Sequence, residues 1–179
     1  LVTGDLGSID ETGRLFITGR KKDVIIRSAH NIDPQMIEDA LLAHPKVETA
    51  AAVGMPDAYA GELPMAFIVT RDQWAPDQQE LLSFLAERIE DPLAIPQRIQ
   101  VIDEMPMPPV GKIFKPALRS EAIRAALDLA LGDLARVVRV TLDEENSVTI
   151  HAPDDSKALI SERLVGMPLT LSFAPIGKA

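Results

Sequence analysis

Short apolar runs separated by polar turns predict a series of strands in the first half of the chain. The β-prone runs at 15–17 and 24–26 flank a charged turn and predict a hairpin. The Ala/Val-rich run at 47–53 and the run at 63–70 predict two strands that pair antiparallel across a loop at 56–61. A further short strand is expected at 99–102. Together these runs indicate a small sheet.

Three helices are expected between and after these strands. Asp33 followed by Pro34 is a natural N-cap and first-turn pair, apolar residues follow at 37, 40, 41 and 42, and His44-Pro45 ends the segment. Asp77 precedes a second helix that carries leucine or isoleucine at 81, 82, 85 and 89 on one face. A third helix is predicted over 116–131.

The pattern changes after residue 132. Strands are expected at 137–142 and 147–150 around an acidic turn that we expect to be solvated, followed by a helix at 156–164 and a strand at 169–173. The fold class is therefore α+β. We expect residues 1–132 to form a small mixed sheet with a β-hairpin and packed helices. We expect residues 133–179 to form a β-β-α-β appendage that packs on its outer face and carries no catalytic group.

Composition limits the function classes. Hydrophobic residues make up 46% of the 179 residues and aromatic residues only 4%, so the core must consist mainly of Ala, Leu, Ile and Val. The formal net charge of −9 argues against a nucleic-acid partner. There is no cysteine, and the three histidines are too scattered to suggest a zinc site, so no metal site is expected. Without an apolar run of transmembrane length or a signal-peptide pattern, we expect a cytoplasmic protein.

Candidate chemistry is concentrated in a lysine loop, residues 106–115. Its prolines restrict the backbone, and Gly111 allows a close approach to a ligand or a positive φ. The ammonium group of Lys112 is suited to phosphate or carboxylate oxygens. By itself, such a loop is more often an ordinary surface loop with a solvated lysine.

Three motifs in order change that interpretation. Thr3-Gly4-Asp5, then the run from Gly13 to Asp23, then the lysine loop resemble the C-terminal portion of adenylate-forming enzymes. These include acyl-CoA synthetases, adenylation domains of peptide synthetases and luciferases. Residues 30–38 are similar to the next block of the family, and residues 111–118 are closest to bacterial fatty-acyl-CoA synthetases. The resemblance covers residues 3 to about 125 and implies that a large N-terminal domain of the same chain is missing, which fits a start without methionine.

The resemblance implies roles for individual residues. Lys112 matches the catalytic lysine, which bridges the negative charges of a carboxylate and an α-phosphate. Asp5 matches the aspartate that binds the ribose hydroxyls, and Arg20 the arginine near the ribose and phosphate, although each also suits an ordinary turn. Lys22 matches the hinge position between two domain orientations. Lys115 is expected to be a solvated charge.

Ser28-Ala29-His30 is similar to the loop that lines the pantetheine tunnel for coenzyme A. The family usually has glycine where this chain has Ala29, and alanine disfavours a positive φ, which bears on the thioester half-reaction only. His30 is expected to be structural or to face solvent, since no carboxylate partner is evident nearby.

The resemblance implies the C-terminal catalytic-lysine domain of an acyl-CoA synthetase. The intact enzyme should use ATP with magnesium to convert a carboxylic acid to acyl-AMP and then transfer the acyl group to coenzyme A. The likeness of residues 111–118 to fatty-acyl-CoA synthetases implies a fatty acid. The fragment alone should be inactive and hold no tightly bound cofactor. Two alternatives stay open: an adenylating enzyme that loads a carrier protein or stops at acyl-adenylate, and a non-catalytic α+β binding or regulatory module.

Overall fold

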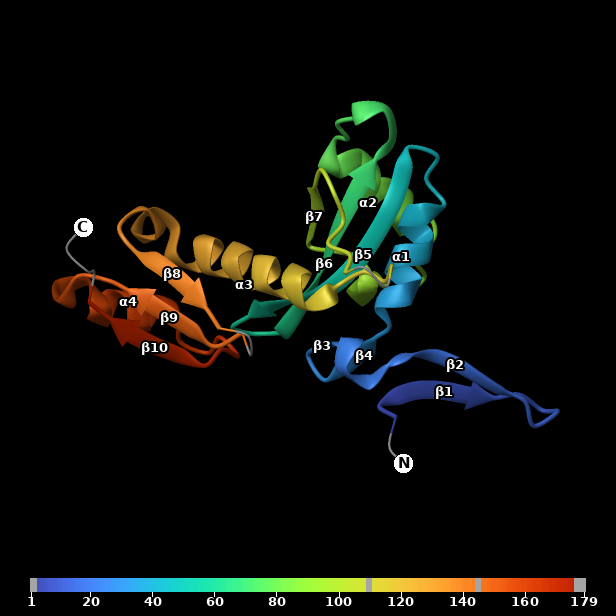
Figure 1. Cartoon of the computed structure of the whole chain (residues 1–179), viewed down its shortest axis with the longest axis horizontal. Coiled ribbons are helices and arrows are strands. Elements are labelled where there is room, and N and C mark those ends of the chain that lie inside the picture. The colour runs from blue at the N-terminus through green and yellow to red at the C-terminus, as the bar shows by residue number, and fades with distance from the viewer. Residues whose placement is uncertain (1–2, 109–110, 144–145, 176–179) are drawn as a thin grey trace.

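The computed structural model describes residues 3–108, 111–143 and 146–175, and its parts follow one another along the chain (Figure 1). A two-stranded hairpin comes first, a five-stranded sheet with three helices forms the middle, and a three-stranded sheet with one helix comes last. The α+β class expected from the sequence is confirmed. Within the described residues, no helix is both long and apolar enough to span a membrane.

The N-terminal hairpin differs from the one expected. Strand β2 (Leu15–Arg20) pairs antiparallel with β1 (Asp5–Ile9), and not with the run at 24–26. The chain reverses at Asp10, whose carboxylate accepts hydrogen bonds from the backbone N–H groups of Thr12 and Arg14, each at 2.9 Å. Hydrogen bonds from the Thr12 hydroxyl and the Arg14 backbone hold the pKa of Asp10 below its ordinary value. The expected pairing is wrong because the charged segment forms a 3-10 turn, η1 (Lys21–Asp23), which continues the chain.

The central sheet is built on one long antiparallel pair. Strands β5 (Val47–Asp57) and β6 (Gly61–Thr70) pair antiparallel as expected, but both are longer, so that the loop expected at 56–61 shrinks to a tight turn. On its other edge β6 pairs in parallel with β7 (Arg98–Val101) and touches β3 (Ile25–Arg27) at its start. Strand β3 in turn pairs with β4 (His30–Ile32).

Helices cover both faces of this sheet, because successive residues of β5 and β6 point to opposite sides. Helices α1 (Pro34–Leu42) and α2 (Gln78–Ala86) pack on the face that carries Ala50, Ala52, Ala66 and Ile68. Their expected N-caps are confirmed: the Asp33 and Asp77 carboxylates accept from the N–H groups two residues later. Helix α3 (Lys115–Leu131) packs on the opposite face.

Helix α3 belongs to two hydrophobic cores. Its first half packs on the sheet through Leu118 and Ala122, against Phe67 and Met65 of β6. Its second half packs on the appendage through Ile123, Leu127 and Leu131. The helix therefore carries two apolar stripes that point in different directions, and it joins the two parts of the chain (Figure 1).

The appendage has the expected β-β-α-β order. Its elements are β8 (Arg139–Leu142), β9 (Val148–His151), α4 (Lys157–Arg163) and β10 (Leu171–Ala174). Strand β9 lies in the centre, antiparallel to β8 and parallel to β10. The Ser120 hydroxyl of α3 donates to the Asn146 side chain at 2.7 Å, which fastens the β8–β9 turn to the helix. Two residues of the acidic turn expected to be solvated, 144 and 145, lie outside the described residues.

The remaining 3-10 turns are η2 (Arg71–Gln73), η3 (Pro92–Ala94), η4 (Gly132–Arg136) and η5 (Asp154–Ser156).

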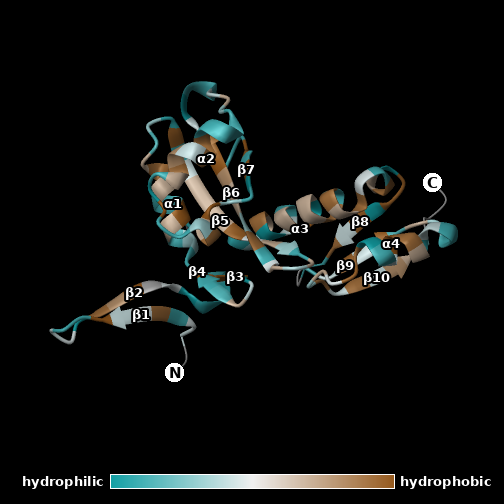
Figure 2. Cartoon of the chain, turned by 180° about the vertical axis from the view of Figure 1, so that it is seen from behind, coloured by the Kyte–Doolittle hydropathy of each residue, from teal (hydrophilic) through white to brown (hydrophobic). Residues whose placement is uncertain are grey.

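The β1–β2 hairpin stands away from the central sheet and carries apolar segments (Figure 2). Ile9, Leu15 and Ile17 are each about 70% exposed there. Such a group of apolar side chains on an isolated hairpin is typical of a surface that another part of a protein covers.

Candidate functional site

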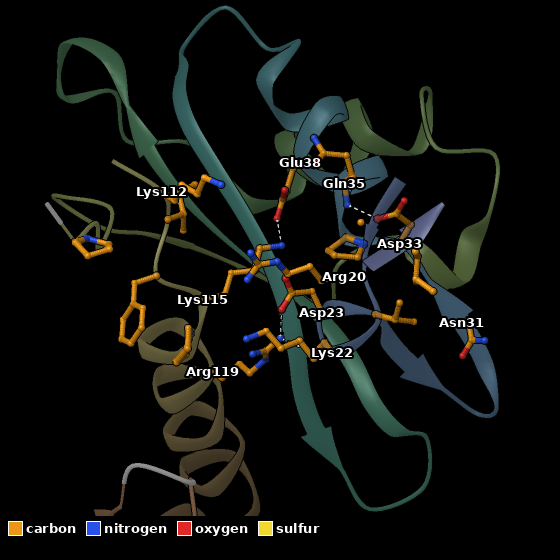
Figure 3. Close-up of a pocket in the computed structure, with 18 residues that line it drawn as sticks. Arg20, Lys22, Asp23, Asn31, Asp33, Gln35, Glu38, Lys112, Lys115 and Arg119 are labelled. Atoms are coloured by element: carbon orange, nitrogen blue, oxygen red, sulfur yellow. Dashed lines mark hydrogen bonds and ion pairs between the residues drawn. The ribbon is translucent and has the colours of Figure 1, made fainter. Parts of the chain in front are cut away.

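A cleft of about 730 Å³ lies where the hairpin, α1 and the lysine loop meet (Figure 3). The hairpin and η1 contribute Arg20 and Lys22, α1 contributes Glu38, and the lysine loop contributes Lys112. The structure therefore brings together residues that are more than 90 positions apart in the sequence. Two of these, Arg20 and Lys112, are the residues expected at a nucleotide and at its reacting phosphate.

Cations exceed carboxylates in the cleft. The cationic lining residues are Arg20, Lys22, Lys112, Lys115 and Arg119, and the anionic ones are Asp23, Asp33 and Glu38. The chain as a whole carries a net charge of −9, so this local excess of positive charge is unusual for the molecule. The arrangement suits an anion that carries phosphate or carboxylate groups.

Lys115 holds the end of the lysine loop in place. Its ammonium lies 2.7 Å from Glu38 Oε1, and the same oxygen accepts the backbone N–H of Ala52 at 2.8 Å. The side chains are only 17% and 10% exposed. The expectation of a solvated Lys115 is therefore wrong, because its side chain reaches the buried carboxylate of Glu38 on α1. Glu38 went unnoticed in the sequence, although its position three residues before Leu41 puts it on the buried face of α1.

Arg119 joins α3 to the segment that follows the hairpin. Its Nη2 donates to the Lys22 carbonyl at 2.7 Å and to Asp23 Oδ1 at 2.6 Å. The two side chains of this ion pair are 25% and 18% exposed, so solvent screens it only partly. Sequence analysis missed Arg119, since its partners lie 96 and 97 residues earlier. The contact fixes the segment that contains the expected hinge residue, Lys22.

Lys112 differs from both of these neighbours. It is exposed in the cleft, and within the described residues no carboxylate lies within 4.0 Å of its ammonium or that of Lys22. The loop is closed at its base by the Phe114 N–H, which donates to the Pro106 carbonyl at 2.7 Å. Gly111 has a φ of +75°, which favours glycine by conformation, while the space around it is open. Residues 109 and 110 lie outside the described residues.

Asp5 sits beside the cleft through its strand partner. Asp5 and Arg20 are opposite each other in the β1–β2 register, and Asp5 Oδ1 lies 3.9 Å from Arg20 Nε. The Lys21 N–H donates to the Gly4 carbonyl at 2.9 Å and holds this end of the hairpin closed. Thr3 and Gly4 also line a second hollow, which shares Arg20 and Lys22 with the cleft. Asp5 and Arg20 are thus close together, and their roles toward a nucleotide stay predictions.

The segment Ser28-Ala29-His30 lies away from the cleft lining. Ser28 and Ala29 form the turn between β3 and β4, with φ angles of +50° and +64°. His30 Nε2 lies 2.7 Å from Asp91 Oδ2. His30 is half exposed, in line with the expectation of a structural or solvent-facing residue. Its carboxylate partner was not evident nearby in the sequence because it comes from a position 61 residues later. A role in a pantetheine tunnel stays a prediction.

No metal site emerges from the described part of the chain, in which no group of three or more His, Asp or Glu side chains is placed to hold an ion. The cationic lining of the cleft suits the binding of a polyanion, and the role of Lys112 toward developing negative charge stays a prediction.

Comparison with known proteins places this geometry in context. Residues 36–112 match the family model described as the AMP-binding enzyme C-terminal domain. The chain is 49% identical over 123 residues to a marinolic acid–CoA ligase of Pseudoalteromonas sp. (strain SANK 73390), with 69% of this chain and 19% of that protein covered. It is 38% identical over 121 residues to a long-chain-fatty-acid–CoA ligase of Bacillus subtilis (strain 168), with 68% and 21% covered.

Solved structures agree with this likeness. ATP-bound MatB from Rhodopseudomonas palustris aligns with a TM-score of 0.65 and 32% sequence identity, over 69% of this chain and 24% of that one. The chain spans about a fifth of the length of the two ligases that it matches. The matched proteins are therefore much longer than the sequence described here.

Proposed function

We propose that this chain is the catalytic-lysine part of an acyl-CoA synthetase, because residues 36–112 match the family model of the AMP-binding enzyme C-terminal domain. The intact enzyme activates a carboxylic acid, of fatty type, with ATP and magnesium to give acyl-AMP and pyrophosphate. It then transfers the acyl group to the thiol of coenzyme A and releases AMP. Residues 1–132 form the mobile catalytic part in this proposal, and residues 133–179 form a separate small appendage.

The observation that carries the proposal is the environment of Lys112. Its ammonium is exposed in a cationic cleft without a carboxylate partner in the described residues, whereas Lys115 and Arg119 are held in ion pairs. In the adenylation step the attacking carboxylate and the α-phosphate repel each other, and a cation that touches both stabilises the transition state. Lys112 can serve both anions because, among the residues that the structure describes, no carboxylate is paired with it.

Asp5 and Arg20 are proposed to hold the nucleotide. A carboxylate accepts two hydrogen bonds from a vicinal diol, which suits Asp5 to the ribose hydroxyls. Arg20 lines the cleft beside it and suits the ribose–phosphate region. Lys22, which follows directly in η1, is proposed as the hinge about which this part of the enzyme turns between the two half-reactions.

The remaining partners follow from the same proposal. The N-terminal domain of the intact enzyme supplies the acid pocket and the phosphate loop, and it covers the exposed apolar side chains of the β1–β2 hairpin, such as Ile9 and Ile17. The turn at Ser28-Ala29-His30 lines the path of the pantetheine arm. ATP, the carboxylic acid and coenzyme A are all substrates in this scheme.

The test is Lys112→Ala in the intact enzyme. Pyrophosphate release should fall by roughly 10²–10³-fold, because the lost cation acts on charge that develops in the adenylation step. Thioester formation from supplied acyl-adenylate should be largely spared. The matched control is Lys46→Ala, since Lys46 is an exposed lysine outside the cleft that pairs with Asp72 at 3.7 Å.

Two results would contradict the assignment. Pyrophosphate release that stays within about tenfold of the unmutated rate would exclude Lys112 as the catalytic lysine. No pyrophosphate release at all from the unmutated enzyme, with a range of acids, would favour the non-catalytic module.

Ala29, at a φ of +64° where glycine is the easier residue, favours a second candidate that loads a carrier protein or stops at acyl-adenylate. Offering coenzyme A and a carrier protein in parallel separates that candidate.

A further inference from the structure

The turn between β3 and β4 has an unfavourable backbone for its residues. Ser28 and Ala29 are its two central residues, between the opposed pair Arg27 and His30, and both have positive φ angles, +50° and +64°. Positive φ at both central positions is what a type I′ hairpin turn requires, and Asn-Gly is the usual sequence there. Neither serine nor alanine prefers this region. Contacts from elsewhere in the fold must therefore hold the turn in this form.

Two of these contacts reach the same short segment, residues 91–93, and a third reaches the β5–β6 turn. Arg27 Nη1 donates to the Leu93 carbonyl at 2.7 Å, and His30 Nε2 lies 2.7 Å from Asp91 Oδ2. The two residues that flank the turn are thus both attached to residues 91–93. A third contact, from the Ser28 N–H to the Ala60 carbonyl at 2.7 Å, ties the turn itself to the β5–β6 turn.

Asp91 organises the segment to which the flanks attach. While Oδ2 faces His30, Oδ1 accepts the Leu93 N–H at 2.9 Å and caps η3, whose Ala94 is fully buried. Hydrogen bonds from the Leu93 N–H and the His30 ring hold the pKa of Asp91 below its ordinary value. One carboxylate therefore fixes both η3 and, through His30, the β3–β4 turn.

We propose that Asp91 is a positioning residue for the thioester half-reaction. Acting through His30, it holds the Ser28–Ala29 turn in its left-handed form, and so sets where the turn meets the pantetheine arm of the thiol substrate. This inference rests on the proposed function, in which that turn lines the thiol path. A displacement of about 1 Å at such a contact is enough to slow a reaction step by roughly 10²-fold.

Asp91→Ser in the intact enzyme tests the proposal. Serine still caps η3 but is too short to reach His30 as well. Thioester formation from supplied acyl-adenylate should fall by about tenfold or more, and pyrophosphate release should stay within about twofold. The matched control is Asp77→Ser, since Asp77 caps α2 in the same way and contacts neither His30 nor the turn.

Adding Ala29→Gly to Asp91→Ser separates positioning from a general loss of structure. Glycine adopts a positive φ without help, so it should restore the thiol rate to within about threefold of the unmutated enzyme. Equal loss of both half-reactions in Asp91→Ser, or failure of Ala29→Gly to restore the thiol rate, would overturn the proposal.

Amide hydrogen exchange measures the stability of the turn independently of any catalytic rate. The Ser28 N–H, bonded to Ala60, should exchange faster in Asp91→Ser and return toward its original rate when Ala29→Gly is added. Unchanged exchange in Asp91→Ser overturns the link between Asp91 and the turn. An unmutated enzyme that makes no thioester with coenzyme A or a carrier protein would instead refute the proposed function, and the exchange result would still decide the link.

Discussion

Lys112 and Lys115 lie three residues apart in the sequence but in opposite environments. Lys112 is exposed in the cleft, whereas Lys115 reaches Glu38 at 2.7 Å and is mostly buried. The resemblance of the loop to a known motif singled out Lys112, but nothing in the local sequence showed that Lys115 is paired. A buried pair of this kind depends on how the fold brings the start of α3 within reach of Glu38 on α1, which residue types alone do not reveal.

Lys115→Met should lower the free energy of unfolding by roughly 3 kcal/mol. The substitution leaves the buried Glu38 carboxylate with the Ala52 N–H as its one remaining partner among the described residues. Urea unfolding measures the loss, and Lys46→Ala serves as the exposed control. A second variant, Lys115→Met with Glu38→Gln, should recover part of the loss because it removes the unpaired charge. If Lys115→Met lowers the free energy of unfolding by less than about 0.5 kcal/mol, the Lys115–Glu38 pair contributes no more than an ordinary surface ion pair.

At the scale of elements, the long apolar strands and capped helices were predictable, whereas the β1–β2 and β3–β4 hairpins were not. Residues 47–53 and 63–70 read as strands because alanine, valine and isoleucine occupy both faces of a covered sheet. The β3–β4 turn was missed because Ser28-Ala29 lacks the Asn or Gly that marks a two-residue turn. The charged segment at 20–23 looked like a turn instead, and it led to the wrong partner for β2.

Helix α3 offers a test of its second apolar stripe. Leu127 is fully buried against the appendage, while Leu129, two residues later, is 64% exposed. Leu127→Ala should lower the free energy of unfolding by about 3 kcal/mol, since it removes buried methyl groups and leaves a cavity. Leu129→Ala should change it by less than about 0.5 kcal/mol. Similar effects of the two substitutions, measured by urea unfolding, would mean that the appendage does not pack on α3 as described.

At the scale of the whole molecule, the order of the elements was predictable, but the contacts between distant segments were not. The β-β-α-β order of the appendage followed from its alternating apolar residues, but its attachment to α3 did not. The same holds for the cleft: the contacts that shape it join residues up to 97 positions apart, as between Arg119 and Lys22. A motif resemblance could bring Arg20 and Lys112 into one hypothesis, while Glu38 and Asp91 needed the fold.

Deletion of residues 133–179 from the intact enzyme should lower its melting temperature or disturb its assembly more than its turnover per folded molecule. The deletion uncovers Ile123, Leu127 and Leu131 on α3, which together form one side of the core between α3 and the appendage. Thermal unfolding and light scattering measure the first effect, and rates normalised to folded protein measure the second. A truncated enzyme that keeps its melting temperature and assembly but loses turnover would assign the appendage a direct part in the reaction.

The shared helix also has a mechanical consequence. With 17 residues, α3 is a rod of about 25 Å, clamped to the sheet along its first half and to the appendage along its second. Any rotation about the Lys22 segment that carries the lysine loop also carries this rod. A tilt of about 10° at its first turn sweeps its far end through about 4 Å. The appendage sits at the far end of α3, so a small rotation of the helix near Lys112 would displace the appendage by several times the shift at the first turn.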